Sequence, residues 1–84
     1  MLASVRDALR RRDGEAALAR LDAYESQYPQ AVFAEECAGA RVLALCLVGR
    51  REQASRLRDV FLAAHSESPL APRVRAACSE QNEE

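Results

Sequence analysis

The side chains best suited to chemistry in this 84-residue sequence are one histidine and three cysteines. His65 has no cysteine or histidine three or four residues away, which is the spacing that lets two metal ligands share one helix face. It also has no neighbouring nucleophile or acid to complete a catalytic pair. We therefore expect His65 to pack at a helix end. The sequence predicts no catalytic residue, no metal site and no cofactor.

The three cysteines, Cys37, Cys46 and Cys78, show no Cys-x-x-Cys metal spacing. Cys37 and Cys46 lie nine residues apart on one predicted helix. That spacing is about 13 Å at a rise of 1.5 Å per residue, too long for a bridge. Two alternatives stay open. The favoured one is that all three are small buried thiols, and the other is a disulfide between Cys46 and Cys78 in an oxidising compartment.

Glu35 and Glu36 are the candidate carboxylate pair. Neighbouring residues on a helix diverge by about 100°, so we predict that these two carboxylates do not share an acid–base site. They stand at the start of a predicted helix, where negative charge interacts favourably with the helix dipole.

A basic patch lies near the end of the first predicted helix, formed by Arg10-Arg11-Arg12 with Arg6. Positive charge at a helix carboxyl end suits the dipole and favours solubility. The alternative interpretation is a binding surface for an acidic segment of a partner.

Composition favours helix and argues against several classes of protein. Alanine occurs 17 times and arginine 12 times, while isoleucine, threonine and tryptophan are absent. A net charge of -1 argues against a nucleic-acid binder. The longest apolar run, Val42–Val48, is far below the roughly 18–20 residues that span a bilayer, so no membrane insertion is expected. The compartment stays open: cytoplasmic, or periplasmic and cell-envelope if the chain is a fragment of an anchored protein.

Breakers such as Gly14, Pro29, Gly49 and Pro69 divide the chain into five predicted helices. Short connections force successive helices to lie antiparallel and adjacent. The third helix is apolar on most sides, which predicts a central position. Residues 1–78 are predicted to form one domain and residues 79–84 a polar tail. The helices are expected at about Leu2–Arg12, Glu15–Tyr28, Val32–Val48, Arg51–His65 and Pro69–Cys78.

An offset of 37 residues relates two parts of the sequence. It places Ala17 on Ala54, Tyr24 on Phe61, and the Arg12-Asp13-Gly14 break on Gly49-Arg50-Arg51. Identities alone are few, but both predicted hairpins break and restart at this one offset.

This pattern resembles the tetratricopeptide repeat, a helix pair with a period of about 34 residues. The family has a small residue early in its second helix and a proline twelve positions later. Ala17 and Pro29 match that pair. Ala54 matches the first position again, whereas Ser66 stands in place of the proline.

The longer period and the phrases Gln27-Tyr28-Pro29 and Glu67-Ser68-Pro69-Leu70-Ala71 are similar to one branch of the family. That branch includes the lipoprotein of the bacterial outer-membrane barrel-assembly machinery. The resemblance implies an all-α, right-angle superhelical array of antiparallel helix pairs, with two hairpins and a carboxy-terminal capping helix. It also implies a non-catalytic scaffold that holds a protein or peptide.

In such repeats the first helix of each pair lines the concave face. The resemblance thus implies that Arg6, Arg10, Glu36 and Ala40 border a partner-binding surface. A separate hypothesis is a homo-oligomerisation module or a fragment of a larger envelope-associated protein, because nothing caps the first predicted hairpin. Its exposed face would then consist of Leu2, Val5 and Leu9. A helical regulatory or nucleic-acid-binding domain is a third hypothesis, which the near-neutral charge disfavours.

Overall fold

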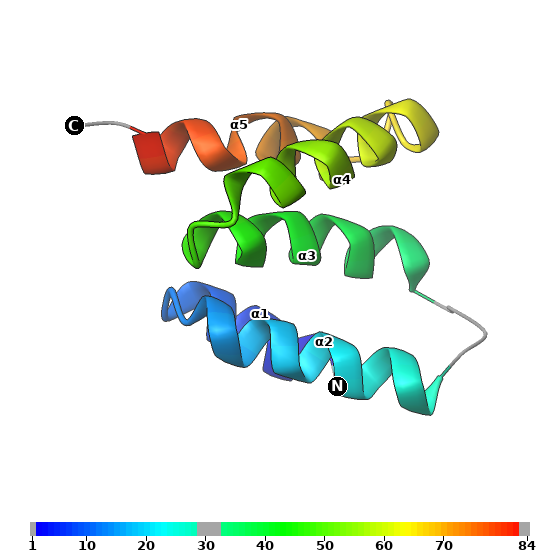
Figure 1. Cartoon of the computed structure of the whole chain (residues 1–84). Helices are drawn as coiled ribbons and strands as arrows, with labels where there is room; N and C mark the ends of the chain where they lie inside the picture. The colour runs from blue at the N-terminus through cyan, green and yellow to red at the C-terminus, as the bar shows by residue number, and fades with distance from the viewer. Residues whose placement is uncertain (1, 29–32, 83–84) are drawn as a thin grey trace.

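The regular structure of this chain is helical throughout the described residues, 2–28 and 33–82, of a computed structural model (Figure 1). This confirms the predicted all-α class and the order of the predicted helices. Within the same residues, no helix has the length and hydropathy needed to cross a membrane. The five helices are α1 (Leu2–Arg10), α2 (Gly14–Gln27), α3 (Ala34–Leu47), α4 (Arg51–Ala64) and α5 (Ala71–Asn82).

Helix α3 is the centre of the molecule. Each helix packs on the next one along the chain, and α3 also packs on α1 and α5. Figure 1 shows α3 between the α1–α2 pair and the α4–α5 pair. Among the described residues, α2 and α4 lie on either side of α3 and make no contact with each other. The prediction of a central apolar helix at Val32–Val48 is confirmed, although Val32 itself lies outside the described residues.

One continuous hydrophobic core joins all five helices. Each helix contributes at least one large side chain that is almost completely buried, and each such burial contributes about 1.5–3 kcal/mol. The described residues therefore share one core. The largest buried side chains are Val5, Leu21, Val42, Leu45, Phe61 and Val74.

The 37-residue offset of the sequence is also an offset of the structure. Helix α2 spans positions 14–27, and α4 spans the equivalent positions 51–64. Helices α3 and α5 begin at Ala34 and Ala71, again 37 positions apart. Ala17 and Ala54, which the offset aligns, are both completely buried. The chain is thus two repeated helical hairpins followed by α5, which is the equivalent of α3.

The turns inside the two hairpins repeat in the same way. Arg12 and Gly49 both adopt positive φ, 59° and 85°. The next residue then bonds back over the helix end in each turn, from the Asp13 N–H to the Ala8 carbonyl and from the Arg50 N–H to the Leu45 carbonyl, both at 2.9 Å. This left-handed closure satisfies the last carbonyls of α1 and α3.

Helix α5 extends beyond its predicted end at Cys78 and includes residues 79–82 of the predicted polar tail. No glycine or proline interrupts this segment, and polar residues such as Glu80 and Gln81 are good helix formers. Polarity alone does not end a helix. Helix α5 also begins at Ala71, since Ser68 and Pro69 form a turn before it.

The predicted self-association face of Leu2, Val5 and Leu9 is not exposed at its centre. Val5 is only 1% exposed, and Leu9 is half-buried against the core. The reason is that α1 packs on α3 as well as on α2, so α3 covers the stripe that an isolated hairpin would expose. The side chain of Leu2 lies outside the described part of the chain.

Candidate functional site

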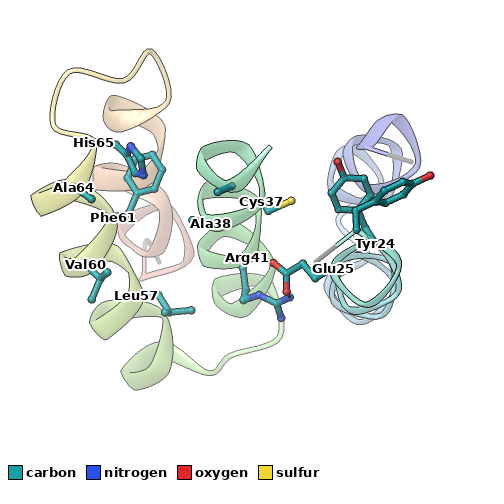
Figure 2. Close-up of a pocket in the computed structure, with 12 residues that line it drawn as sticks. Tyr24, Glu25, Cys37, Ala38, Arg41, Leu57, Val60, Phe61, Ala64 and His65 are labelled. Atoms are coloured by element: carbon teal, nitrogen blue, oxygen red, sulfur yellow. The ribbon is translucent and has the colours of Figure 1, made fainter. Parts of the chain in front are cut away.

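A cleft of about 390 Å³ lies between α2 and α4, with α3 as its floor (Figure 2). We call it the α2–α4 cleft. The floor is shallow because Ala34 and Ala38, four residues apart on one face of α3, carry only methyl groups. The α2 wall consists of Tyr24, Glu25 and Tyr28, and the α4 wall of Leu57, Val60, Phe61, Ala64 and His65. Cys37 and Arg41 complete the floor.

The two walls carry equivalent aromatic pairs. The rings of Tyr24 and Tyr28 are 5.0 Å apart, and those of Phe61 and His65 are 5.1 Å apart, with interplanar angles of 40° and 48°. Each pair is spaced by four residues, and the 37-residue offset relates one pair to the other. Tyr24 and Phe61 are buried at the base, whereas Tyr28 and His65 reach the surface. The tilted ring pairs give both walls an aromatic surface.

Large exposed apolar side chains lie in or near this cleft. In the described part of the chain they are Tyr28, Phe33 and Val60, which are 41%, 47% and 65% exposed. Tyr28 and Val60 line the cleft, and the ring of Phe33 lies 6.4 Å from that of Tyr24. Single exposed apolar residues are ordinary, whereas here two of them line the same hollow.

Charged groups at the cleft floor are paired within the chain. The Arg41 guanidinium contacts Asp22 at 3.1 Å and Glu25 at 2.8 Å, and the Arg41 side chain is only 22% exposed. This ion pair joins α3 to α2. The interior of the cleft is therefore mostly apolar, and the positive charge of Arg41 at its floor is neutralised by carboxylates of the same chain.

Ser68, Glu35 and His65 meet at the other end of the cleft. Glu35 accepts a hydrogen bond from the Ser68 hydroxyl, and its other oxygen lies 3.7 Å from Nδ1 of His65. A hydrolytic site needs the imidazole to contact the serine, whereas here the carboxylate lies between them. Ser68 Oγ also accepts the Leu70 N–H at 3.0 Å. The cluster thus ties the α4–α5 turn to α3, and the hydroxyl donates to the carboxylate and not to the imidazole.

The thiol of Cys37 is free and only 3% exposed. Burial raises its pKa above the ordinary value, and the Glu25 carboxylate adds to the increase, while Arg41 lowers it. Burial likewise raises the pKa of Tyr24, with a smaller contribution from Cys37. Both groups therefore stay neutral at physiological pH, which does not suit a nucleophile or a general base.

A second, smaller hollow contains most of the residues that the sequence placed on a concave face. It measures about 110 Å³ and lies between α1, α3 and α5. Arg6, Glu36 and Ala40 all line it, and Arg6 pairs with Glu36 at 3.3 Å. Arg10 does not line it, because its guanidinium pairs with Asp7 on α1 at 3.2 Å.

The adjacent acids diverge as predicted. Glu36 turns to Arg6 on α1, while Glu35 turns to His65 and Ser68 at the α4–α5 turn. The two carboxylates therefore serve two different helix contacts. Within residues 2–28 and 33–82, no group of three histidine, cysteine or acidic side chains is arranged to hold a metal ion.

Of the two alternatives for the cysteines, the structure has the bridged one. Cys46 and Cys78 form a disulfide across a Cα–Cα distance of 5.2 Å and a sequence separation of 32 residues. Cys46 is buried and Cys78 is half-buried. The bond ties α5 to the central helix.

Sequence reasoning missed the α2–α4 cleft, although part of its signal was visible. Tyr24 and Tyr28 are spaced to share a helix face, and the offset places Phe61 and His65 on them. Periodicity gave no indication that α2 and α4 would stay apart, since that depends on how both pack on α3.

The chain matches no protein-family model, no curated protein and no solved structure in the comparisons with known proteins.

Proposed function

We propose that this chain is a non-catalytic protein–protein interaction module of the tetratricopeptide type, which binds a helical segment of a protein in the α2–α4 cleft. The observation that carries the proposal is an apolar cleft lined by the exposed side chains of Tyr28 and Val60, with the exposed ring of Phe33 near Tyr24. An aliphatic and aromatic hollow between helices suits the apolar stripe of an amphipathic helix.

The repeated hairpin supports the tetratricopeptide-like part of the proposal. Ala17 and Ala54 occupy equivalent, completely buried positions early in the second helix of each hairpin. A small side chain there lets the two helices of a pair approach closely. Right-angle superhelical stacking of the two pairs, with α5 as a cap, is the arrangement we infer. The disulfide favours an oxidising compartment, which suits the cell-envelope branch of the family.

Binding fits the chemistry of the cleft better than catalysis. Its acids and its arginine are paired with each other, and its thiol and buried phenol are held neutral. What remains available is apolar surface. A nucleic-acid-binding role has less support, since arginines such as Arg6, Arg10 and Arg41 face carboxylates.

A photoreactive residue at position 64 tests the proposal. Ala64 is exposed and lines the cleft, and Ala76 is an exposed alanine of α5 that does not line it, so position 76 is the matched control. In extract from the source cells, irradiation is expected to give protein adducts from position 64 and few from position 76. Equal labelling from both positions, or no adduct from position 64, would show that the cleft is not the docking site.

A further inference from the structure

We infer that α5 is a redox-controlled cap, which the Cys46–Cys78 disulfide attaches to α3 and which a dithiol reductant releases. The inference does not depend on the proposed function, because no residue of α5 lines the α2–α4 cleft. Helix α5 lines the smaller hollow of 110 Å³ instead, to which it contributes Arg73 and Val74.

The apolar face of α5 is incomplete. The 37-residue offset aligns α5 with α3, so positions 79, 81 and 82 correspond to the buried residues Val42, Ala44 and Leu45. In α5 these three positions hold serine, glutamine and asparagine. Helix α5 therefore repeats only the first half of the apolar face of α3. Its buried side chains, among those that the structure describes, are Ala71, Val74 and Ala77.

The two ends of α5 are attached to α3 in different ways. At the start, a Cβ on Gly39 of α3 would lie 3.3 Å from the side chain of Leu70 and 3.5 Å from that of Val74. The absence of a side chain at Gly39 thus lets the first turn of α5 approach α3 closely. Cys78 lies about 10 Å further along the helix axis than Ala71, and there the attachment is the disulfide.

Helix α5 has little stability of its own. It contains 12 residues, and isolated helices of that length are marginal in water. Among the described helices it packs only on α3 and α4. Its order therefore depends on the contacts around Gly39 and on the bond at Cys78. Without the bond, the polar second half of the helix has no attachment to α3.

The exchange that cuts the bond begins at Cys78. Cys46 is buried and Cys78 is half-buried, so an attacking thiolate has access to Cys78. One thiolate of the dithiol bonds to Sγ of Cys78, and the electron pair of the S–S bond leaves on Sγ of Cys46, which takes up a proton. The second thiolate of the reductant then displaces Cys78, which is protonated in turn. The protein gains two electrons and two protons, and the dithiol becomes a disulfide.

Release of α5 takes the 110 Å³ hollow apart. Arg73 and Val74 supply its α5 side, while Val5 and Leu9 of α1 and Gly39 of α3 supply the remainder of its apolar lining with their neighbours. The oxidised chain presents this hollow, and the reduced chain exposes the strip of α3 that α5 had covered. The disulfide thus controls this hollow and leaves the α2–α4 cleft unchanged.

Hydrogen exchange of the oxidised protein, and of the same protein in dithiothreitol, tests the inference by mass spectrometry. Reduction is expected to lower the protection of the α5 amides at least ~10-fold, while α2 and α4 keep their protection. Reoxidation with glutathione disulfide should restore the protection of α5. The control Cys37→Ala should respond as the wild type does, since Cys37 is not part of the bridge.

The double variant Cys46→Ala/Cys78→Ala removes the bond without a reductant. Its α5 should exchange rapidly and should not respond to dithiothreitol. Trypsin gives a second readout, because Arg73 and Arg75 of α5 and Arg56 of α4 are all exposed. Relative to the oxidised wild type, cleavage after Arg73 and Arg75 should be at least ~10-fold faster in the variant, while cleavage after Arg56 keeps its rate.

Two results would overturn the inference. If α5 keeps its protection after reduction, packing alone attaches it to α3. If all five helices lose protection together, the bond stabilises the whole fold and controls no separate cap. The proposed function fails separately, since it depends on the adducts from position 64, which reduction of the bond should leave unchanged.

Discussion

The side chains of Cys37 and Tyr24 form the buried junction between α2 and α3, beneath the α2–α4 cleft. Burial is the main reason why the pKa values of both groups are raised. The carboxylates of Glu25 and Glu36 contribute in the same direction to the Cys37 thiol. Because both groups are uncharged when protonated, the folded chain favours the neutral form of each.

This preference predicts a loss of stability at alkaline pH. In the unfolded chain the thiol and the phenol ionise near their ordinary values, 9.0 and 10.0, while the folded chain holds their protons to higher pH. Their contribution to the free energy of unfolding is therefore fully present below pH 9.0 and is lost as the pH rises through the raised values. Urea unfolding between neutral pH and about pH 11 measures the effect.

The matched variant carries Cys37→Ala and Tyr24→Phe. It should show a flatter dependence on pH, since it has neither group, and it cannot exchange a thiolate with the Cys46–Cys78 bond. If the wild type and this variant lose stability in parallel, the raised pKa values do not control alkaline unfolding.

At the residue scale, helix geometry predicted in which direction a side chain points but not which residue it contacts. It showed that Glu35 and Glu36 diverge and that Cys37 cannot reach Cys46. It did not show that Glu35 meets Ser68, because that contact depends on how the α4–α5 turn folds back over the start of α3. The sequence favoured free thiols over the Cys46–Cys78 disulfide for a similar reason. Cys46 meets Cys78 only because α3 and α5 pack on each other, and the spacing of residues does not show that packing.

At the level of the elements, the turns after α1 and α3 share one left-handed conformation but differ in sequence. Gly49 adopts positive φ without steric cost, whereas a non-glycine residue such as Arg12 loses about 1–2 kcal/mol there. A methyl group at Gly49 would meet no atom within 4 Å, so any effect of substitution is conformational.

Exchanging these residue types should therefore change stability in opposite directions. Arg12→Gly is expected to stabilise the fold by up to about 1 kcal/mol, a figure that already deducts the greater freedom of glycine in the unfolded chain. Gly49→Ala is expected to destabilise the fold by about 1 kcal/mol. Urea midpoints measure both. Arg11→Gly, one position earlier at negative φ, is the control and should destabilise. A loss of stability in Arg12→Gly would contradict the equivalence of the two turns.

The elements themselves were the most predictable part of the fold. Gly14 and Gly49 mark helix limits locally, so five helices and their 37-residue offset follow from spacing alone. The end of α5 was missed because residues 79–82 carry no stop signal. The burial of Val5 was not predicted, because the apolar stripe of α1 does not by itself indicate that α3 packs over it.

The disulfide is the one covalent link between elements of the described structure. It closes a loop with a sequence separation of 32 residues, for which the loss of unfolded-chain entropy contributes about 3–4 kcal/mol. We expect reduction by dithiothreitol to lower the thermal midpoint clearly and to loosen α5 first. Scanning calorimetry with and without the reductant measures the shift.

Two variants make this measurement specific. Cys78→Ser should reproduce the reduced midpoint and become insensitive to the reductant, whereas Cys37→Ala should keep the full shift. A midpoint that does not respond to reduction would mean that packing alone holds α5 on α3.

At the scale of the whole molecule, α3 contacts every other helix. It is half of the second hairpin and also covers the apolar face of the first. Val42 and Leu45 of α3 are both about 1% exposed, and they belong to the same core cluster as residues of α1, α2, α4 and α5. A repeat protein usually unfolds by neighbouring units. Because the central helix is shared, we expect the two hairpins to unfold as one cooperative unit.

Leu45→Ala tests this coupling. Truncating a buried leucine costs about 2–5 kcal/mol, and the loss should fall equally on both hairpins because Leu45 lies in their common core. Near-ultraviolet dichroism of Tyr24 and Tyr28 reports the first hairpin, and hydrogen exchange of α4 reports the second. Both should shift to one lower urea midpoint. The control Val60→Ala, at an exposed site, should barely move that midpoint. Separate midpoints for the tyrosines and for α4 would show that the hairpins fold independently, which would contradict the role assigned to α3.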